Sequence, residues 1–334
     1  MDANISNVQS LGNEQDMYNV KVGETIKQLR QQRSLSQREL TKCDTPSETI
    51  CSTKTLRRIE QGKVAPSIFE IKFFLSVFGV SMSEFESLVE GQDLLTFRNS
   101  FEEICNLLFD ERYQEASRHL ELLKEQKYCD PKNPQILQAL LLCDGFFQRN
   151  LHKNLQASLD VLYSALRITV PSVISEDNRV KYGIISDRMF SLNEYRILNL
   201  IAIILIDLNQ NYLATRIFKA MCKSLQNKKI SSEIRNHFLP TTYYNLSDCF
   251  IDEKRYKEAF NVCEEGLEFC ESIKNFKNFA KLLYNRAKSL YYMGDKESAA
   301  EGFKHSYSTF ISLKRNEMAS RVKTIVATKY QINL

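Results

Sequence analysis

Hydrophobic residues recur along this chain every three or four positions, the spacing that gathers them on one side of an α-helix. Near the start, Ile26 and Leu29 have this spacing, and two longer amphipathic runs follow over 67–78 and 81–88. Residues that end helices are scarce, because the 334 residues include only ten Gly and six Pro. The pattern therefore predicts an all-α protein.

Between these runs lie the start signals of two short helices. Ser36 occupies an N-cap position and Glu39 follows three residues later, which together predict a capping box. A second helix is predicted to start at Ser52, and Gly62 is expected to end it as its C-cap. Five short helices in succession are typical of a helix-turn-helix domain, which we place at residues 20–92.

The second of these helices is predicted to have one apolar stripe and one basic face. Leu56 and Ile59 have the i, i+3 spacing of a buried stripe. The residues left pointing largely outward are Thr53, Lys54, Arg57 and Arg58. Residues 20–65 contain ten Lys or Arg and five Asp or Glu, an excess of five positive charges, whereas the whole chain carries +4. Charge alone fits a solvated cationic face equally well, but the charge, the helix caps and the apolar stripe together favour a surface for DNA phosphates.

The helix pair contains the sequences SQREL at 36–40, ICS at 50–52 and IEQG at 59–62, followed by a Pro-Ser step at 66–67. This pattern resembles the Cro/C1-type helix-turn-helix family. One departure from the family pattern is the segment Thr41–Thr49, which lengthens the turn between the two helices. The sequence leaves open whether this insertion contacts DNA.

The resemblance implies that the second helix enters the major groove of double-stranded DNA with its early residues facing base edges. The residues implied for base contact are Ser52, Thr53, Lys54, Thr55 and Arg58. Phosphate contacts are expected from Gln37, Arg38, Arg57 and Lys63. Because a single domain of this size binds weakly, we expect a homodimer on two half-sites about 34 Å apart.

Beyond residue 95 the chain repeats itself. The segment 109–116 closely echoes 251–259, and each contains a Tyr-x-x-Ala step, YQEA in the first and YKEA in the second. This pattern resembles tetratricopeptide repeats, in which such a step lets the second helix of a hairpin pack closely on the first. We therefore expect about five degenerate repeats over residues 98–334, stacked as a right-handed α-solenoid whose first helices line its concave side.

The expected concave side carries an asparagine at a similar place on three successive first helices, namely Asn199, Asn245 and Asn285. An amide side chain both donates and accepts hydrogen bonds, which suits the backbone of an extended peptide. Aromatic and cationic side chains nearby complete the set of candidate peptide contacts: Tyr195, Tyr244, Tyr284, Arg196, Lys281 and Arg286. The alternatives are that the asparagines bond neighbouring helices and that the tyrosines pack in the core.

No catalytic or metal-binding pattern stands out. The nine cysteines form no CxxC pair, so we expect neither a metal site nor disulfides and interpret them as core residues in a reducing cytosol. The four histidines lie in no recognisable catalytic motif, and no nucleotide fingerprint occurs, so we expect neither an enzyme nor a cofactor. No apolar run is long enough to cross a membrane, and the polar residues 1–19 predict a disordered leader rather than a secretory signal.

Joined in this order, the two parts resemble the peptide-sensing transcription regulators of Gram-positive bacteria, the Rgg, PlcR and PrgX type. The resemblance implies a cytoplasmic homodimer that binds promoter DNA and a short quorum-sensing oligopeptide, and that alters promoter binding or activity in response. The alternative is an adaptor or phage-type regulator whose repeats bind a protein partner instead of a free peptide. The peptide, the operator and the direction of control are not implied.

Overall fold

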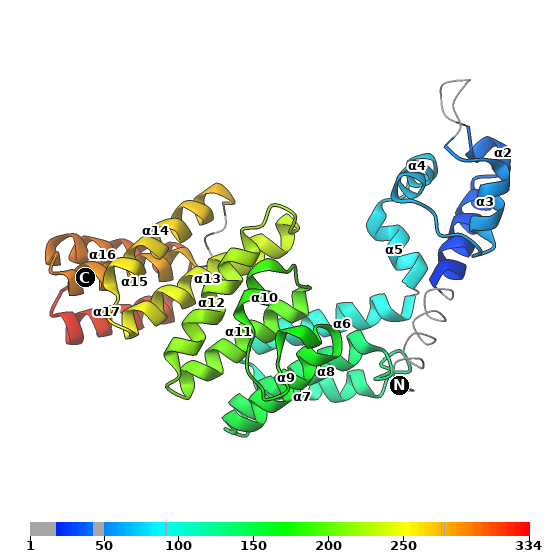
Figure 1. Ribbon diagram of the computed structural model, residues 1–334. Coiled ribbons are helices and arrows are strands. Elements are labelled where there is room, and N and C mark those ends of the chain that lie inside the picture. The colour runs from blue at the N-terminus through cyan, green and yellow to red at the C-terminus, as the bar shows by residue number, and fades with distance from the viewer. Residues whose placement is uncertain (1–17, 43–49, 91, 275, 277) are drawn as a thin grey trace. The chain divides into compact units, whose positions relative to one another are not determined.

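The computed structural model describes residues 18–42, 50–90, 92–274, 276 and 278–334 (Figure 1). Every named element in these ranges is a helix, and an isolated bridge joins Ile174 to Val180. The predicted all-α fold is therefore confirmed. None of the helices described there is both long enough and apolar enough to span a bilayer.

The described residues form two compact units. The first extends to Asn106 and also takes in Glu121–Cys129, and the second comprises Leu107–Leu120 and Asp130–Leu334. The domain boundaries expected at residues 20, 92 and 98 stay predictions. Residues 1–17 of the expected leader and residues 43–49 of the insertion lie outside the described residues, whereas residues 18 and 19 already belong to the first helix.

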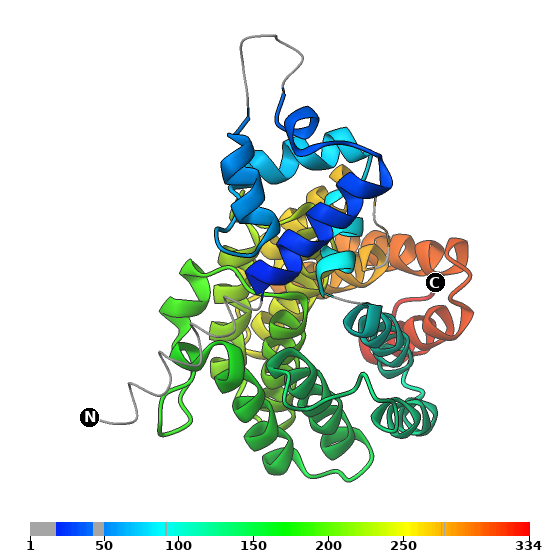
Figure 2. The same cartoon turned by 90° about the vertical axis from the view of Figure 1, so that its right-hand side faces the viewer.

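The first unit begins with the five helices that the sequence predicts, coloured blue to cyan in Figure 2. They span 18–32, Gln37–Leu40 (α2), Thr53–Glu60 (α3), Ile68–Phe78 (α4) and Met82–Glu90 (α5). Their apolar stripes meet in one core, in which the side chains of Leu40, Leu56 and Ile59 are at most 1% exposed. Burial of these stripes is the main force that holds such short helices in place.

Capping boxes start several of these helices. The Ser36 N–H donates to Glu39 Oε2 at 2.7 Å, and the Glu39 N–H donates to Ser36 Oγ at 3.2 Å. The same reciprocal motif precedes α4 and α5. Ser52 caps α3, and Gly62 follows that helix with φ +70°, the left-handed conformation expected for its end. The predicted helix starts are therefore confirmed.

The remaining helices alternate with short turns to the end of the chain. They are α6 (Gln92–Phe109), α7 (Tyr113–Lys124), α8 (Pro134–Asn150), α9 (Leu155–Thr169), the 3-10 turn η1 (Pro171–Val173), α10 (Tyr182–Asp187), α11 (Leu192–Asp207), α12 (Asn211–Leu225), α13 (Ser232–Asp252), α14 (Tyr256–Ser272), α15 (Phe279–Met293), α16 (Lys296–Ser312) and α17 (Asn316–Tyr330).

In the second unit, consecutive helices pack as hairpins: α8 with α9, α11 with α12, α13 with α14, and α15 with α16. Neighbouring hairpins stack, because α12 packs on α13 and α14 packs on α15, and α17 closes the series against α16 (Figure 1). The first helices of successive hairpins also meet, α11 with α13 and α13 with α15. The Tyr-x-x-Ala steps begin α7 and α14, and their alanines, Ala116 and Ala259, are fully buried. The expected solenoid of tetratricopeptide-like repeats is thus confirmed, with η1 and α10 inserted after α9.

Candidate DNA-binding surface and peptide-binding face

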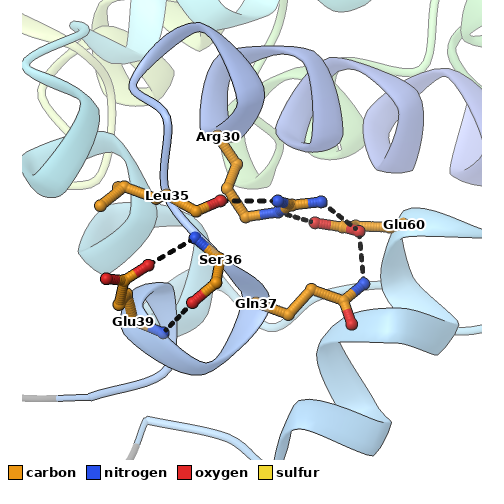
Figure 3. A network of polar contacts seen from close by, with 6 residues as sticks. All are labelled: Arg30, Leu35, Ser36, Gln37, Glu39 and Glu60. Carbon is orange, nitrogen blue, oxygen red and sulfur yellow. Dashed lines mark hydrogen bonds and ion pairs between the residues drawn. The ribbon is translucent and has the colours of Figure 1, made fainter.

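A buried ion pair joins the first helix to the end of α3 (Figure 3). Arg30 donates from Nε to Glu60 Oε1 at 2.6 Å and from Nη2 to Glu60 Oε2 at 3.1 Å. Gln37 Nε2 donates to the same Oε2 at 2.7 Å, and Arg30 Nη1 donates to the Leu35 carbonyl oxygen at 2.7 Å. Only 4% of the Glu60 side chain is exposed. The network therefore fixes the positions of α2 and α3 against the first helix.

The first helix also approaches α3 through Gly23. A Cβ atom built on this residue would lie only 2.1 Å from the carbonyl oxygen of Ile59, which is a backbone atom that cannot move aside cheaply. The absence of a side chain at Gly23 therefore permits the close packing that the Arg30–Glu60 pair requires.

The face of α3 opposite this network is polar and basic. The Ser52 hydroxyl oxygen accepts the Thr55 N–H at 3.0 Å and lies 2.8 Å from the Thr55 hydroxyl, so both side chains help to start the helix. Thr55 is half-buried, and the remaining predicted residues of this helix are exposed: Ser52, Thr53, Lys54, Arg57 and Arg58. Within the described residues, no carboxylate pairs with these three cations. The charges are therefore available to phosphates and base edges.

The predicted phosphate contacts outside α3 fall into two groups. Arg38 and Lys63 are exposed, as a DNA contact requires. The amide nitrogen of Gln37, in contrast, is occupied by Glu60 and ties α2 to α3. Sequence reasoning missed the structural roles of Arg30 and Glu60. The available signal was an acidic residue placed directly after the buried Ile59 in an otherwise basic helix.

In the repeat unit, the three predicted asparagines do link first helices. Asn245 Nδ2 on α13 donates to Asn199 Oδ1 on α11 at 3.0 Å. Asn285 Nδ2 on α15 donates to Ser247 Oγ on α13 at 3.0 Å. Asn199 and Asn245 are half-buried, whereas Asn285 is only 1% exposed. The interpretation that these amides bond neighbouring helices therefore holds for all three, and only Asn285 is buried as well.

Three of the predicted peptide contacts need correction, because their side chains are buried in this structure. Tyr195 is 0% exposed and its hydroxyl lies 2.7 Å from Ser224 Oγ, while Arg196 is 3% exposed. Asn285 is the third. Helical spacing placed these residues on the correct helices, but Tyr195 is bonded to Ser224 on α12 and Asn285 to Ser247 on α13. Core packing, the alternative interpretation for the tyrosines, applies to Tyr195.

The other predicted peptide contacts stay at least partly accessible. Arg286 forms an ion pair with Glu264 on α14 and lies over the Phe260 ring, so its charge is already balanced. Lys281 Nζ lies 5.1 Å from the centre of the Tyr244 ring. Tyr284 is likewise half-buried. Asn199, Asn245, Tyr244, Lys281 and Tyr284 thus form the candidate peptide-binding face, carried by α11, α13 and α15.

Comparison with known proteins supports the assignment of the first unit. A helix-turn-helix family model matches residues 26–85. Over 71 residues the chain is 38% identical to the HTH-type transcriptional regulator PuuR of Escherichia coli and, equally, to PuuR of Shigella flexneri. This match covers 21% of the present chain and 36% of PuuR, so it is confined to about a third of the relative.

Solved structures match over much more of the chain. The PlcR protein of Bacillus thuringiensis, solved in complex with the peptide PapR7 and DNA, is similar with a TM-score of 0.65 and 19% identity, over 91% of this chain and 99% of PlcR. The SHP pheromone receptor Rgg2 of Streptococcus dysgalactiae is similar with a TM-score of 0.55 and 14% identity, over 92% and 99% of the two chains. The protein therefore contains a helix-turn-helix domain over residues 26–85, and the chain shares the fold of PlcR and Rgg2.

Proposed function

We propose that this protein is a cytoplasmic, homodimeric transcription regulator that binds promoter DNA through α3 and a short signalling peptide through its repeats. The observation that carries the proposal is the joining of an exposed basic recognition helix to a repeat unit with a half-buried amide pair. The likeness to PlcR, which was solved with both a peptide and DNA, supports the same combination here.

The amide pair supports recognition of a peptide backbone. The bond from Asn245 to Asn199 uses one donor and one acceptor. It leaves the Asn199 amide nitrogen as a donor and the Asn245 amide oxygen as an acceptor, which is the pair that a peptide group requires. A contact of this kind tolerates different peptide side chains. Specificity then comes from the neighbouring Tyr244, Lys281 and Tyr284.

The proposed switch is a change in the equilibrium between two shapes of the repeat stack. A peptide that bridges α11, α13 and α15 can shift this equilibrium only by the difference between its affinities for the two shapes. A coupling free energy of about 1–3 kcal/mol would change DNA affinity roughly 5- to 150-fold. The dimer transmits the change by altering how its two DNA-binding units are presented to the half-sites.

The test is fluorescence anisotropy of the purified protein on its own upstream DNA, at two salt concentrations, with and without fractionated culture peptides. We expect tight, salt-sensitive binding that changes with one peptide fraction. Arg58→Ala and Lys54→Ala should each weaken DNA binding by about 1–3 kcal/mol, without lowering the melting temperature. The matched control is Lys72→Ala, which removes an exposed cation from α4.

The possible outcomes separate the two halves of the proposal. If Arg58→Ala and Lys72→Ala bind DNA equally well, α3 is not the recognition helix. If DNA binding is indifferent to every peptide fraction, the peptide-sensing half fails and the adaptor alternative, in which the repeats bind a protein, is favoured.

A further inference from the structure

A groove runs between α12 and α14, the second helices of two successive hairpins. One face of α12, from Lys219 to Gln226, forms one wall, and one face of α14, from Glu258 to Glu265, forms the other. Side chains of α13 form the floor. The volume of the groove is about 290 Å³, at the lower end of the range for ligand pockets, so the groove suits a small molecule.

The groove is separate from the candidate peptide-binding face. Its floor consists of Tyr243, Leu246 and Phe250, whose side chains are at most 5% exposed. Successive residues of an α-helix are turned by about 100°, so these three lie on the side of α13 opposite to Tyr244 and Asn245. A ligand in the groove therefore does not contact those two predicted peptide contacts.

Contacts to α13 show how α12 is oriented along the groove. Lys219 Nζ lies 4.8 Å from the centre of the Phe250 ring. Further along α12, Gln226 Nε2 donates to the Tyr243 hydroxyl oxygen at 2.9 Å. The two helices are therefore antiparallel, and Lys219 lies at the end of the groove where Phe250 is found.

Contacts on the other side give the direction of α14. The guanidinium carbon of Arg255, the residue before this helix, lies 4.4 Å from the centre of the Phe250 ring. Near the other end of the groove, a Cβ atom built on Gly266 would lie 3.0 Å from the Tyr243 Cβ. α14 therefore runs parallel to α12, and Glu265, the neighbour of Gly266, lies at the end of the groove where Tyr243 is found.

Two of the charged residues that line the groove are paired with residues outside its walls: Glu258 with Arg255, and Lys223 with Asp187. Lys219 and Glu265, in contrast, form no ion pair with any residue that the structure describes, and both are exposed. Each wall is about 10 Å long, because an α-helix rises about 1.5 Å per residue. The groove thus offers a cation at one end and an anion at the other.

We infer that this groove binds a small zwitterion, with the ligand's carboxylate at Lys219 and its ammonium group at Glu265. Leu246 and Val262 line the groove between its ends and suit an apolar stretch between the two charges. An ω-amino acid or a dipeptide has this layout, whereas an α-amino acid carries both charged groups on one carbon atom and cannot reach both residues. The inference goes beyond the proposed function, because it requires neither DNA nor the signalling peptide.

The test is a ligand-observed NMR titration of the full-length protein with ε-aminocaproate, with the dipeptide alanylleucine and with leucine. We expect ε-aminocaproate, alanylleucine or both to bind, and leucine to bind more weakly. The tighter of the first two identifies the source of the zwitterion. Blocked forms of that ligand, N-acetylated or amidated at the carboxylate, lose one charge each and should bind about fivefold more weakly.

Substitutions then assign the site. Lys219→Ala and Glu265→Gln should each weaken binding of the tighter ligand about fivefold. The matched controls are Lys257→Ala and Glu268→Gln, which remove exposed charges from α14 outside the groove. Exchanging the two charges, in the double variant Lys219→Glu with Glu265→Lys, should restore much of the affinity, because the ligand can bind turned end to end. Loss of a merely structural contact would not be restored in this way.

The outcomes decide the inference whatever the DNA experiments show. Circular dichroism melts first establish that each variant is folded. If neither ε-aminocaproate nor alanylleucine binds, or if the blocked forms bind as tightly as the free zwitterion, the site is overturned. It is also overturned if Lys219→Ala and Glu265→Gln bind the ligand as well as the two controls do.

Discussion

Glu60 accepts hydrogen bonds from two separate elements, the first helix through Arg30 and α2 through Gln37. Because its side chain is 4% exposed, removing it leaves the Arg30 charge buried without its partner. We expect Glu60→Ala to lower the free energy of opening of α3 by about 3–5 kcal/mol, the cost of breaking a buried pair by removing one member. Hydrogen exchange of the α3 amides measures this change.

The control for Glu60→Ala is Glu24→Ala, which removes an exposed carboxylate from the same first helix and should change opening by less than about 0.5 kcal/mol. Equal exchange rates in the two variants would show that the ion pair does not hold α3 in place. DNA affinity should fall with Glu60→Ala, although this side chain does not belong to the exposed face of α3.

The raised pKa values of the buried cysteine thiols predict how slowly these thiols react with alkylating reagents. Burial raises the pKa of the Cys249 and Cys263 thiols to about 12, so almost no thiolate exists at pH 8. Both should resist iodoacetamide in the folded protein and react fully in guanidinium chloride, as mass spectrometry of digests can show. Cys51 is half-buried with its pKa raised to about 11, and it should react sooner. Rapid labelling of Cys263 in the native state would mean that the stack opens readily.

Single residues also show what sequence reasoning can predict. Local signals sufficed for Ser36, Ser52 and Gly62, because a helix start or end depends on atoms within a few residues. Burial of Tyr195 and Asn285 was not predictable, since it depends on how closely a helix far along the chain covers them. The Arg30–Glu60 pair was missed for the same reason, because thirty positions separate its members.

At the scale of elements, the asparagines that link first helices differ in what they contribute. Asn285 is buried with its amide bonded to Ser247, so Asn285→Ala should leave the Ser247 hydroxyl without this bond and destabilise the repeats by about 1–3 kcal/mol. Asn245→Ala breaks a half-buried bond and should cost about 1 kcal/mol or less. Thermal melts of the two variants measure the difference.

The peptide response should be affected specifically by Asn245→Ala, the variant that destabilises the repeats less. Asn245→Ala should weaken the peptide response and leave DNA binding without peptide unchanged. If Asn245→Ala melts the repeats as strongly as Asn285→Ala does, the role of Asn245 is structural and the peptide contact proposed for it is wrong.

The sequence predicted some of the repeat elements but not all of them. The Tyr-x-x-Ala steps identified the starts of α7 and α14, since a small residue is needed wherever two helices of a hairpin approach closely. Nothing comparable marked α10 and η1, which break the series after α9. Their sequence carries no repeat signal because they are an insertion into the repeat pattern and not a member of it.

At the scale of the whole molecule, the proposed homodimer makes a geometric prediction about DNA binding. Once footprinting has located the two half-sites, a five-base-pair insertion between them turns one half-site to the opposite side of the duplex. We expect about a hundredfold weaker binding, because the second contact no longer adds to the first. Gel-shift titration measures the affinity. The control is a ten-base-pair insertion, which returns both half-sites to the same side of the duplex. Unchanged affinity with five base pairs would argue for binding by one DNA-binding unit alone.

The link from Arg30 through Glu60 to Gln37 also limits what a signal can change. Because α2 and α3 are fastened to the first helix, no force from the repeats can tilt α3 by itself without breaking a buried charge pair. The DNA-binding unit must therefore move as one rigid piece. If the protein works as proposed, a peptide sets how often, and with what spacing between the two partners, the dimer occupies its operator. The set of bases that α3 contacts then stays the same with and without peptide.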